Sequence, residues 1–248
     1  MAVAASQSAP ASSLWEALLS EYARGAGCLV ELSAPLHAGA QLSAAVDWLK
    51  AAQSDRSWVA WIQGEQSSFY PPDLAAAGVD LERLLVARLP ESGRAREEDA
   101  HARLKAAEIL VRSGAWPLIV VDLEGMTPRS LAWQGRLQRL LERHRTTLLV
   151  LRRAAAEEAS LGPFVALRLE LRRAETQETP MGFSWQVLRH KRPSFPLSFA
   201  PHFEARNAPA ELCLPWHPSL PKEGEALETK ASAPPALALF REGLGGGR

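Results

Sequence analysis

The residues CLVELSAPLHAGAQ occupy positions 28–41 and combine an apolar run, a turn of small residues and the start of a second apolar pattern. Residues 28–32 are typical of a short buried strand. Beyond the turn, apolar residues recur at helical spacing from Leu42 to Leu49, which predicts a helix that runs to about residue 53. A strand, a small-residue turn and a helix in this order form the usual setting of a phosphate-binding loop. In such a loop, backbone N–H groups at the helix N-terminus surround the phosphates.

The chemical groups of that loop are largely missing. Its pattern is G-x-x-x-x-G-K-[ST], and the aligned residues are Ala34-Pro35-Leu36-His37-Ala38-Gly39-Ala40-Gln41. Ala40 stands in place of the lysine that neutralises the β- and γ-phosphates, and Gln41 in place of the hydroxyl that holds Mg²⁺. We therefore expect no ATPase activity and no required cofactor, although weak nucleotide binding stays an alternative because N–H groups remain at the helix end.

Short apolar runs alternate with helical patterns along the following residues. We expect strands at 58–62, 84–88, 118–122, 147–151 and 165–171, and helices at 97–113 and from 127 onward. Residues 183–190 add an antiparallel strand. This alternation predicts an α/β fold with a mostly parallel central sheet flanked by helices.

The two ends differ from this central part, so we divide the chain into an N-terminal segment (1–27), a core (28–192) and a Pro-rich C-terminal arm and tail (193–248). Ser13 is expected to cap a helix. One face of this helix is apolar and consists of Leu14, Trp15, Leu18, Leu19 and Tyr22. We expect this face to dock on the chain's own core or on another protein. Nine of the 18 prolines follow Arg192, which argues against regular structure there. Trp216 in this arm is a candidate interface anchor.

Formal net charge is zero, with 28 basic and 28 acidic residues, which excludes a histone-like or strongly acidic protein. The charge is nevertheless uneven, because residues 129–192 hold 13 basic and 6 acidic side chains. These basic side chains are solvated or paired with nearby glutamates, or they contact DNA phosphates. The candidate DNA contacts near strand ends are Arg152, Arg153, Arg172, Arg173, Arg189, Lys191 and Arg192.

Other site types find little support in the sequence. Two cysteines do not build a disulfide framework, and the six histidines lack zinc-binding spacing, so we expect no metal site. No apolar run reaches the length of a membrane span, and no secretory signal is apparent. We expect a cytoplasmic protein.

The order of these features resembles the core of the RecA recombinase over roughly residues 29–151. The most specific parts are Gly78-Val79-Asp80 and Arg112-Ser113-Gly114-Ala115, which precede the strands 84–88 and 118–122. The resemblance implies a RecA-like P-loop core in which Glu65 corresponds to the residue that polarises the attacking water. It also implies that Asp122 corresponds to the carboxylate that supports Mg²⁺. Both would be remnants here, in a vestigial site with Ala34, Pro35, Gly39, Ala40 and Gln41.

The chain is shorter than the recombinase itself and looks much more like the ImuA family, the shortened RecA-like proteins of bacterial mutagenesis cassettes. This resemblance implies a non-catalytic accessory role in the SOS response to DNA damage, in support of error-prone translesion synthesis. The implied direct partners are RecA, the ImuB-like Y-family polymerase homologue and a second copy of the chain. The protein would modulate RecA filaments, and it would act indirectly with an error-prone replicative-type polymerase. The resemblance also implies that the protein associates with the nucleoid after DNA damage. The alternatives are a RecA-like ATPase and a DNA-binding module without sequence specificity.

Overall fold

The computed structural model describes residues 11–35, 39–65, 70–91, 96–125, 132–173, 182–191 and 202–204. The helices are α1 (Ala11–Tyr22), α2 (Ala40–Gln53), α3 (Pro71–Ala76), α4 (Arg96–Ser113) and α5 (Ala132–His144), with a 3-10 turn η1 (Leu81–Arg83). The strands are β1 (Leu29–Ala34), β2 (Val59–Gly64), β3 (Leu84–Leu89), β4 (Leu118–Asp122), β5 (Thr147–Arg153), β6 (Val165–Arg173), β7 (Phe183–His190) and β8 (His202–Glu204).

These strands form one sheet in the order β3-β2-β4-β5-β1-β6-β7-β8. The six strands from β1 to β6 pair in parallel, whereas β7 is antiparallel to β6 and β8 is antiparallel to β7. In the register, Glu31 of β1 aligns with Val150 of β5 and Arg168 of β6. The predicted mostly parallel sheet flanked by helices is therefore confirmed.

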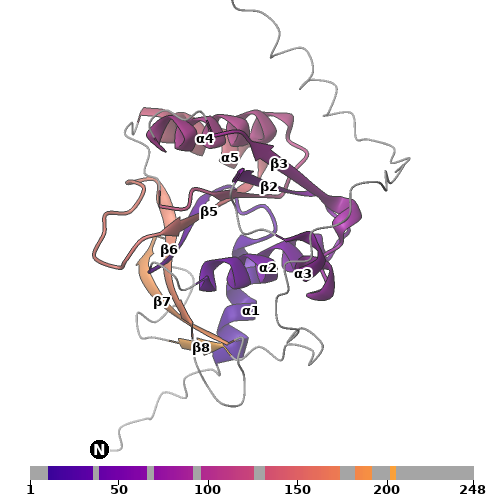
Figure 1. The fold of residues 1–248 in the computed structure, drawn as a ribbon, viewed down its shortest axis with the longest axis vertical. Helices are drawn as coiled ribbons and strands as arrows, with labels where there is room; N and C mark the ends of the chain where they lie inside the picture. Colours follow the sequence, from indigo (N-terminus) through magenta and orange to yellow (C-terminus); the bar gives the residue numbers. More distant parts are fainter. Residues whose placement is uncertain are drawn as a thin grey trace, which may run out of the picture. The chain divides into compact units, whose positions relative to one another are not determined.

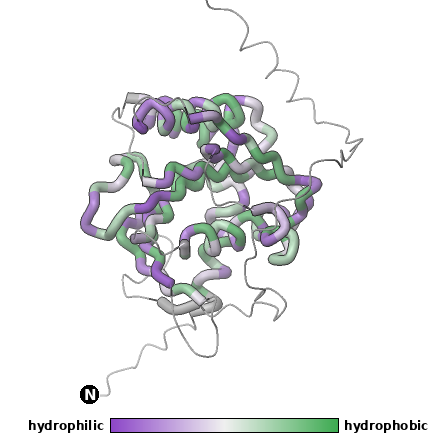
Figure 2. Tube along the Cα trace, in the orientation of Figure 1, coloured by the Kyte–Doolittle hydropathy of each residue, from purple (hydrophilic) through white to green (hydrophobic). Residues whose placement is uncertain are grey.

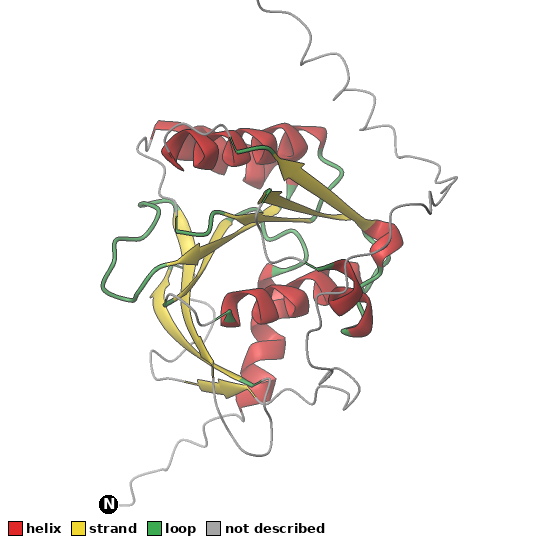
Figure 3. Cartoon of the chain, viewed as in Figure 1, coloured by secondary structure: helices red, strands yellow, loops and turns green. Residues whose placement is uncertain are grey.

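Helices cover both faces of the sheet, as Figures 1 and 3 show. On one face α1 and α2 pack against alternate strand residues such as Val30, Leu32 and Val120. On the other face α4 and α5 pack against the intervening residues, including Ile119 and Val150. Burial on both faces explains why these strands are nearly continuous apolar runs, seen as green segments in Figure 2.

Several element boundaries differ from the sequence prediction. The strands β1, β2, β5 and β6 each run two residues further, because backbone pairing continues through polar or small residues such as Gly64, which pairs with Leu89. Helix α1 begins at Ala11, so the prediction of Ser13 as its cap is wrong. The 3-10 turn η1 and the short helix α3 were not predicted. The predicted start of α5 at Thr127 lies outside the described residues.

The C-terminal arm is not free of regular structure. Residues 202–204 form β8, which pairs with the start of β7 through Phe183 and Trp185. The prediction that prolines exclude regular structure after residue 193 is therefore wrong at this point. A proline-free stretch of three residues suffices for an edge strand, because such a strand pairs along only one side.

Candidate functional site

The parallel arrangement brings the predicted vestigial residues to one edge of the sheet. Ala34 ends β1, Asp122 ends β4, and Glu65 directly follows β2. Strand β5 lies between β1 and β4, while β2 pairs directly with β4. Since parallel strands have their carboxyl ends at the same edge of a sheet, all three positions lie at that edge.

The loop before α2 ends at Gly39, whose φ of 58° lies in the left-handed region that favours glycine. Pro35 is half-buried at the other end of the loop, and residues 36–38 lie outside the described ranges. Ala40 and Gln41 are both buried in the first turn of α2. Neither supplies a cation or a hydroxyl, so the first turn lacks the two groups that grip a nucleotide tail and its metal.

A cation nevertheless approaches this loop from another strand. Arg173, at the end of β6, is exposed, and its Nη2 atom would lie 3.6 Å from a β-carbon placed on Gly39. The sequence predicts Arg173 as a DNA contact and does not connect it with the loop, because Arg173 and Gly39 are 134 positions apart in the chain. Only the pairing of β6 with β1 brings them together.

The two carboxylates have different surroundings. Glu65 is exposed, whereas Asp122 is buried, and its Oδ1 atom accepts the backbone N–H of Glu124 at 2.9 Å. The backbone carbonyl of Asp122 accepts a hydrogen bond from the buried Arg103 on α4 at 2.7 Å, and Arg103 also pairs with Glu124 at 3.2 Å. Asp122 thus belongs to a hydrogen-bond network that links the end of β4 to α4.

Sequence reasoning missed Arg103, which lies on the inward face of α4. A β-carbon at position 64 would overlap its guanidinium group, so glycine at the end of β2 is what admits the arginine. One signal was present: a charged residue at an apolar helical position, directly before Leu104. Its hydrogen-bond partners are the carbonyl of Asp122 at the end of β4 and the carboxylate of Glu124 just beyond it, and no local pattern identifies them.

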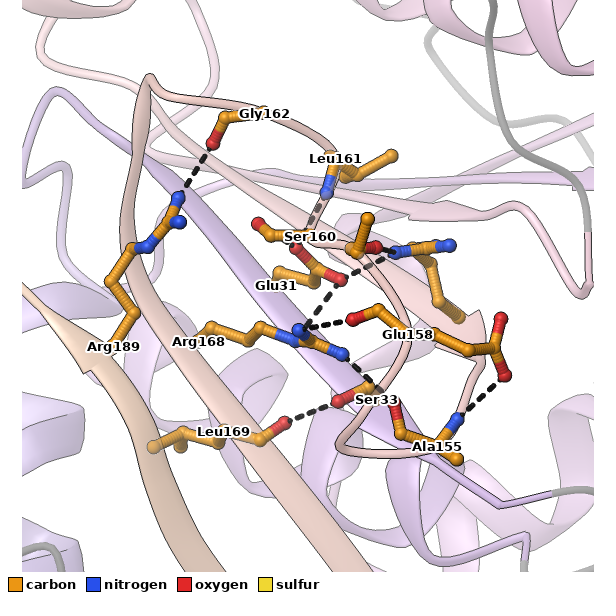
Figure 4. Close-up of polar contacts among 12 residues, drawn as sticks. Glu31, Ser33, Ala155, Glu158, Ser160, Leu161, Gly162, Arg168, Leu169 and Arg189 are labelled. Carbon is orange, nitrogen blue, oxygen red and sulfur yellow. Dashed lines mark hydrogen bonds and ion pairs between the residues drawn. The ribbon is translucent and has the colours of Figure 1, made fainter.

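A second buried charge cluster surrounds Glu31, the carboxylate in the middle of β1 (Figure 4). Its Oε1 atom pairs with Nη1 of Arg152 at 2.7 Å and with Nε of Arg168 at 3.4 Å. All three side chains are buried. The prediction of Arg152 as a DNA contact is therefore wrong, because its guanidinium faces a carboxylate inside the protein.

The same cluster fastens the loop between β5 and β6 to the sheet. The Oε2 atom of Glu31 accepts hydrogen bonds from the Ser160 hydroxyl at 2.7 Å and the Leu161 N–H at 3.0 Å. Arg168 donates to the carbonyls of Glu158 and Ala155 at 2.8 and 3.0 Å. The sequence signal was a glutamate within the apolar run 28–32, which in a fully buried strand requires a charged partner.

The remaining predicted DNA contacts do not form one surface. Arg153, Arg172 and Arg173 are exposed at the carboxyl edge of the sheet. Arg172 pairs with Glu170 at 3.1 Å.

Arg189 and Lys191 lie instead beside the beginning of β6, because β7 runs antiparallel to it. Arg189 donates to the carbonyl of Gly162 at 2.8 Å. Partial burial, followed by the neighbouring Arg189 charge, lowers the pKa of Lys191. Arg192 lies outside the described residues.

The N-terminal helix uses its apolar face within the chain. Trp15, Leu18 and Tyr22 are buried, and Leu14 and Leu19 are half-buried against the same core. The ring of Trp15 lies 5.3 Å from that of Phe183, and the Tyr22 hydroxyl lies 2.8 Å from Nε2 of His190. Of the two alternatives, the structure favours docking on the chain's own core, and a partner that used this face would first have to displace α1. Trp216 lies outside the described ranges.

The described residues hold neither a metal-binding cluster nor a membrane-spanning helix. They contain no group of three or more His, Cys, Asp or Glu side chains arranged to hold a metal ion. Within the same ranges, no helix has both the length and the apolar character needed to cross a membrane. In comparisons with known proteins, no family model matches the chain and no curated protein sequence is significantly similar to it.

Proposed function

We propose that this chain is a non-catalytic, RecA-like accessory protein of the bacterial DNA-damage response. In this role it supports error-prone translesion synthesis through contacts with RecA and with an ImuB-like polymerase homologue. The observation that carries the proposal is the first turn of α2, where Ala40 and Gln41 are buried below the loop that resembles a phosphate-binding loop. A nucleotide tail at this position would meet neither a lysine nor a metal-binding hydroxyl from the helix.

The surroundings of the two carboxylates support the same interpretation. Asp122 accepts a backbone hydrogen bond, and its own carbonyl is held by Arg103, so this strand end has a structural role that does not need a metal. Glu65 is exposed in the turn after β2. A carboxylate that activates water works best in a site from which bulk water is excluded, and exposure gives Glu65 no such environment.

The edge strand β3 supports a role in protein contact. It lies at the end of the sheet, and no described strand pairs with its outer side. Val86 on β3 is 37% exposed, and the neighbouring Leu81 on η1 is 38% exposed. An unpaired strand edge with exposed apolar side chains is a template for binding an extended segment of another protein.

This proposal is tested by capture of purified RecA, with and without single-stranded DNA, on the immobilised full chain. Val86→Glu places a charge on the exposed edge strand, and we expect it to lower RecA recovery several-fold. Ile109→Glu is the matched control, because Ile109 is 44% exposed on α4, on the opposite face of the sheet from α2. No recovery of RecA by the wild-type chain, or equal recovery by both variants and wild type, would contradict the proposal.

A second candidate function is nucleotide binding without turnover, and three observations favour it. Arg173 brings a cation to Gly39. Gln41 in the first turn of α2 and Gln63 on β2 are buried, with amide atoms that have no hydrogen-bond partner in the described part of the chain. Such polar atoms favour a polar ligand beside them.

Calorimetric titration with ATP and Mg²⁺ separates the two functions. Nucleotide binding predicts a measurable affinity that Arg173→Ala abolishes, while Arg88→Ala, which removes an exposed arginine from β3, leaves it unchanged. An absence of binding would leave the non-catalytic accessory role as the only proposal.

A further inference from the structure

The outer surface of α4 and α5 carries a cluster of exposed arginines, which we call the arginine cluster: Arg112, Arg136, Arg139 and Arg143. Three of them lie on α5 at positions i, i+3 and i+7, which places them on one side of that helix. From Arg136 to Arg143 the helix rises about 10 Å. Arg112 and Arg143 lie in the last turns of their helices, where the negative end of the helix dipole favours cations.

One carboxylate organises part of this cluster. Glu108 on α4 accepts Nε and Nη2 of Arg136 at 3.0 and 3.1 Å, and Nη2 of Arg112 at 2.6 Å. Only 13% of the Glu108 side chain is exposed, while the two arginines are 59% and 61% exposed. Arg139 and Arg143 have no ion pair within the described residues. The cluster therefore keeps an excess of positive charge on a fixed framework.

An exposed aromatic ring lies beside this cluster. Phe164, at the end of the β5–β6 loop, is 42% exposed. Its Cζ atom would lie 3.4 Å from a β-carbon placed on Gly135. Gly135 precedes Arg136 and lies one helical turn before Arg139. The ring of Phe164 therefore lies against α5 at Gly135, next to the arginines.

We propose that this surface, the arginine cluster together with Phe164, binds single-stranded nucleic acid without sequence preference. Guanidinium groups along one side of a helix contact successive phosphates, and an exposed aromatic ring stacks on an unpaired base. A duplex keeps the faces of its bases stacked inside, and an acidic peptide offers negative charge without bases, so the ring favours a single strand over both. This inference goes beyond the proposed function and does not depend on contacts with RecA or on nucleotide binding.

The experiment is fluorescence anisotropy with a labelled thymidine oligonucleotide, its duplex form and poly-glutamate, titrated with the full chain over a series of salt concentrations. We expect salt-dependent binding that is tightest for the single strand. Arg139→Ala with Arg143→Ala removes two phosphate contacts, which lowers affinity at least tenfold and reduces the magnitude of the salt slope by roughly 1.4. Phe164→Leu lowers affinity for the single strand by about tenfold and leaves the salt slope unchanged.

Arg88→Ala is the matched control, because it removes an exposed arginine from β3 and should leave every affinity unchanged. Circular dichroism and the urea midpoint establish that each variant is folded. The proposal is overturned if wild type shows no binding at low salt, or if the double variant binds as wild type does. It is also overturned if the duplex or poly-glutamate binds at least as tightly as the single strand.

Discussion

Two groups of arginines differ in the burial and in the hydrogen-bond partners of their guanidinium groups. Around Glu31, two guanidinium groups are buried, and their hydrogen bonds are directed to a carboxylate and to carbonyls of the β5–β6 loop. On α4 and α5, four guanidinium groups are exposed, and two of them, those of Arg112 and Arg136, pair with the carboxylate of Glu108. The net charge of residues 129–192 therefore does not identify a binding surface, because arginines of this one segment are either buried beside Glu31 or exposed on α5.

The largest expected effect comes from removing the buried carboxylate. Glu31→Gln leaves the guanidinium groups of Arg152 and Arg168 buried without a negative charge, which should lower the free energy of unfolding by about 3–5 kcal/mol. Urea denaturation measures this loss. Glu142→Gln, on the exposed side of α5, is the matched control and should change stability by less than about 0.5 kcal/mol. If Glu31→Gln lowers the free energy of unfolding no more than the control does, the arginines around Glu31 do not differ in structural role from those on α4 and α5.

An intermediate effect is expected from Arg168→Met. The pair of Glu31 and Arg152 stays neutral, but two carbonyls of the β5–β6 loop lose their donor. The free energy of unfolding should fall by about 1–3 kcal/mol. Hydrogen exchange adds a local readout, because the amides of residues 155–161 should exchange faster while those of β4 are unaffected. Unchanged exchange in that loop would show that Arg168 does not hold it.

The smallest expected effect is that of Arg112→Ala in the arginine cluster. Glu108 keeps its two hydrogen bonds from Arg136, and the side chain removed is exposed. The free energy of unfolding should change by no more than about 0.5 kcal/mol, as is typical of surface ion pairs. A change above about 2 kcal/mol would mean that this cluster is a structural element like the one around Glu31.

Much of the fold could be predicted because its signals are local. Strand β4 matches its predicted residues, since four large apolar residues in a row fit a strand buried on both faces. Strand β7 also matches, together with its antiparallel direction. The candidate site was less predictable. Arg152 and Arg153 are neighbours in sequence, but side chains alternate along a strand, so the first reaches Glu31 and the second is exposed.

The contacts that sequence reasoning missed all join distant segments. Arg103 reaches the ends of β2 and β4, Arg173 reaches Gly39, and Phe164 rests on Gly135. In one of these contacts, at Gly64, a glycine admits a bulky side chain from a distant part of the chain. The sequence shows the glycine, but its partner becomes known only when the strand order and register are known.

We propose that the chain keeps an α/β scaffold at whose candidate site ATP is not hydrolysed. The most direct measurement is phosphate release by the purified chain with ATP and Mg²⁺, compared with the variants Asp122→Asn and Glu65→Gln. Asparagine keeps the acceptor for the Glu124 N–H, so the first variant should remain folded. We predict the same background rate for all three proteins. Turnover by wild type that both substitutions abolish would contradict the claim.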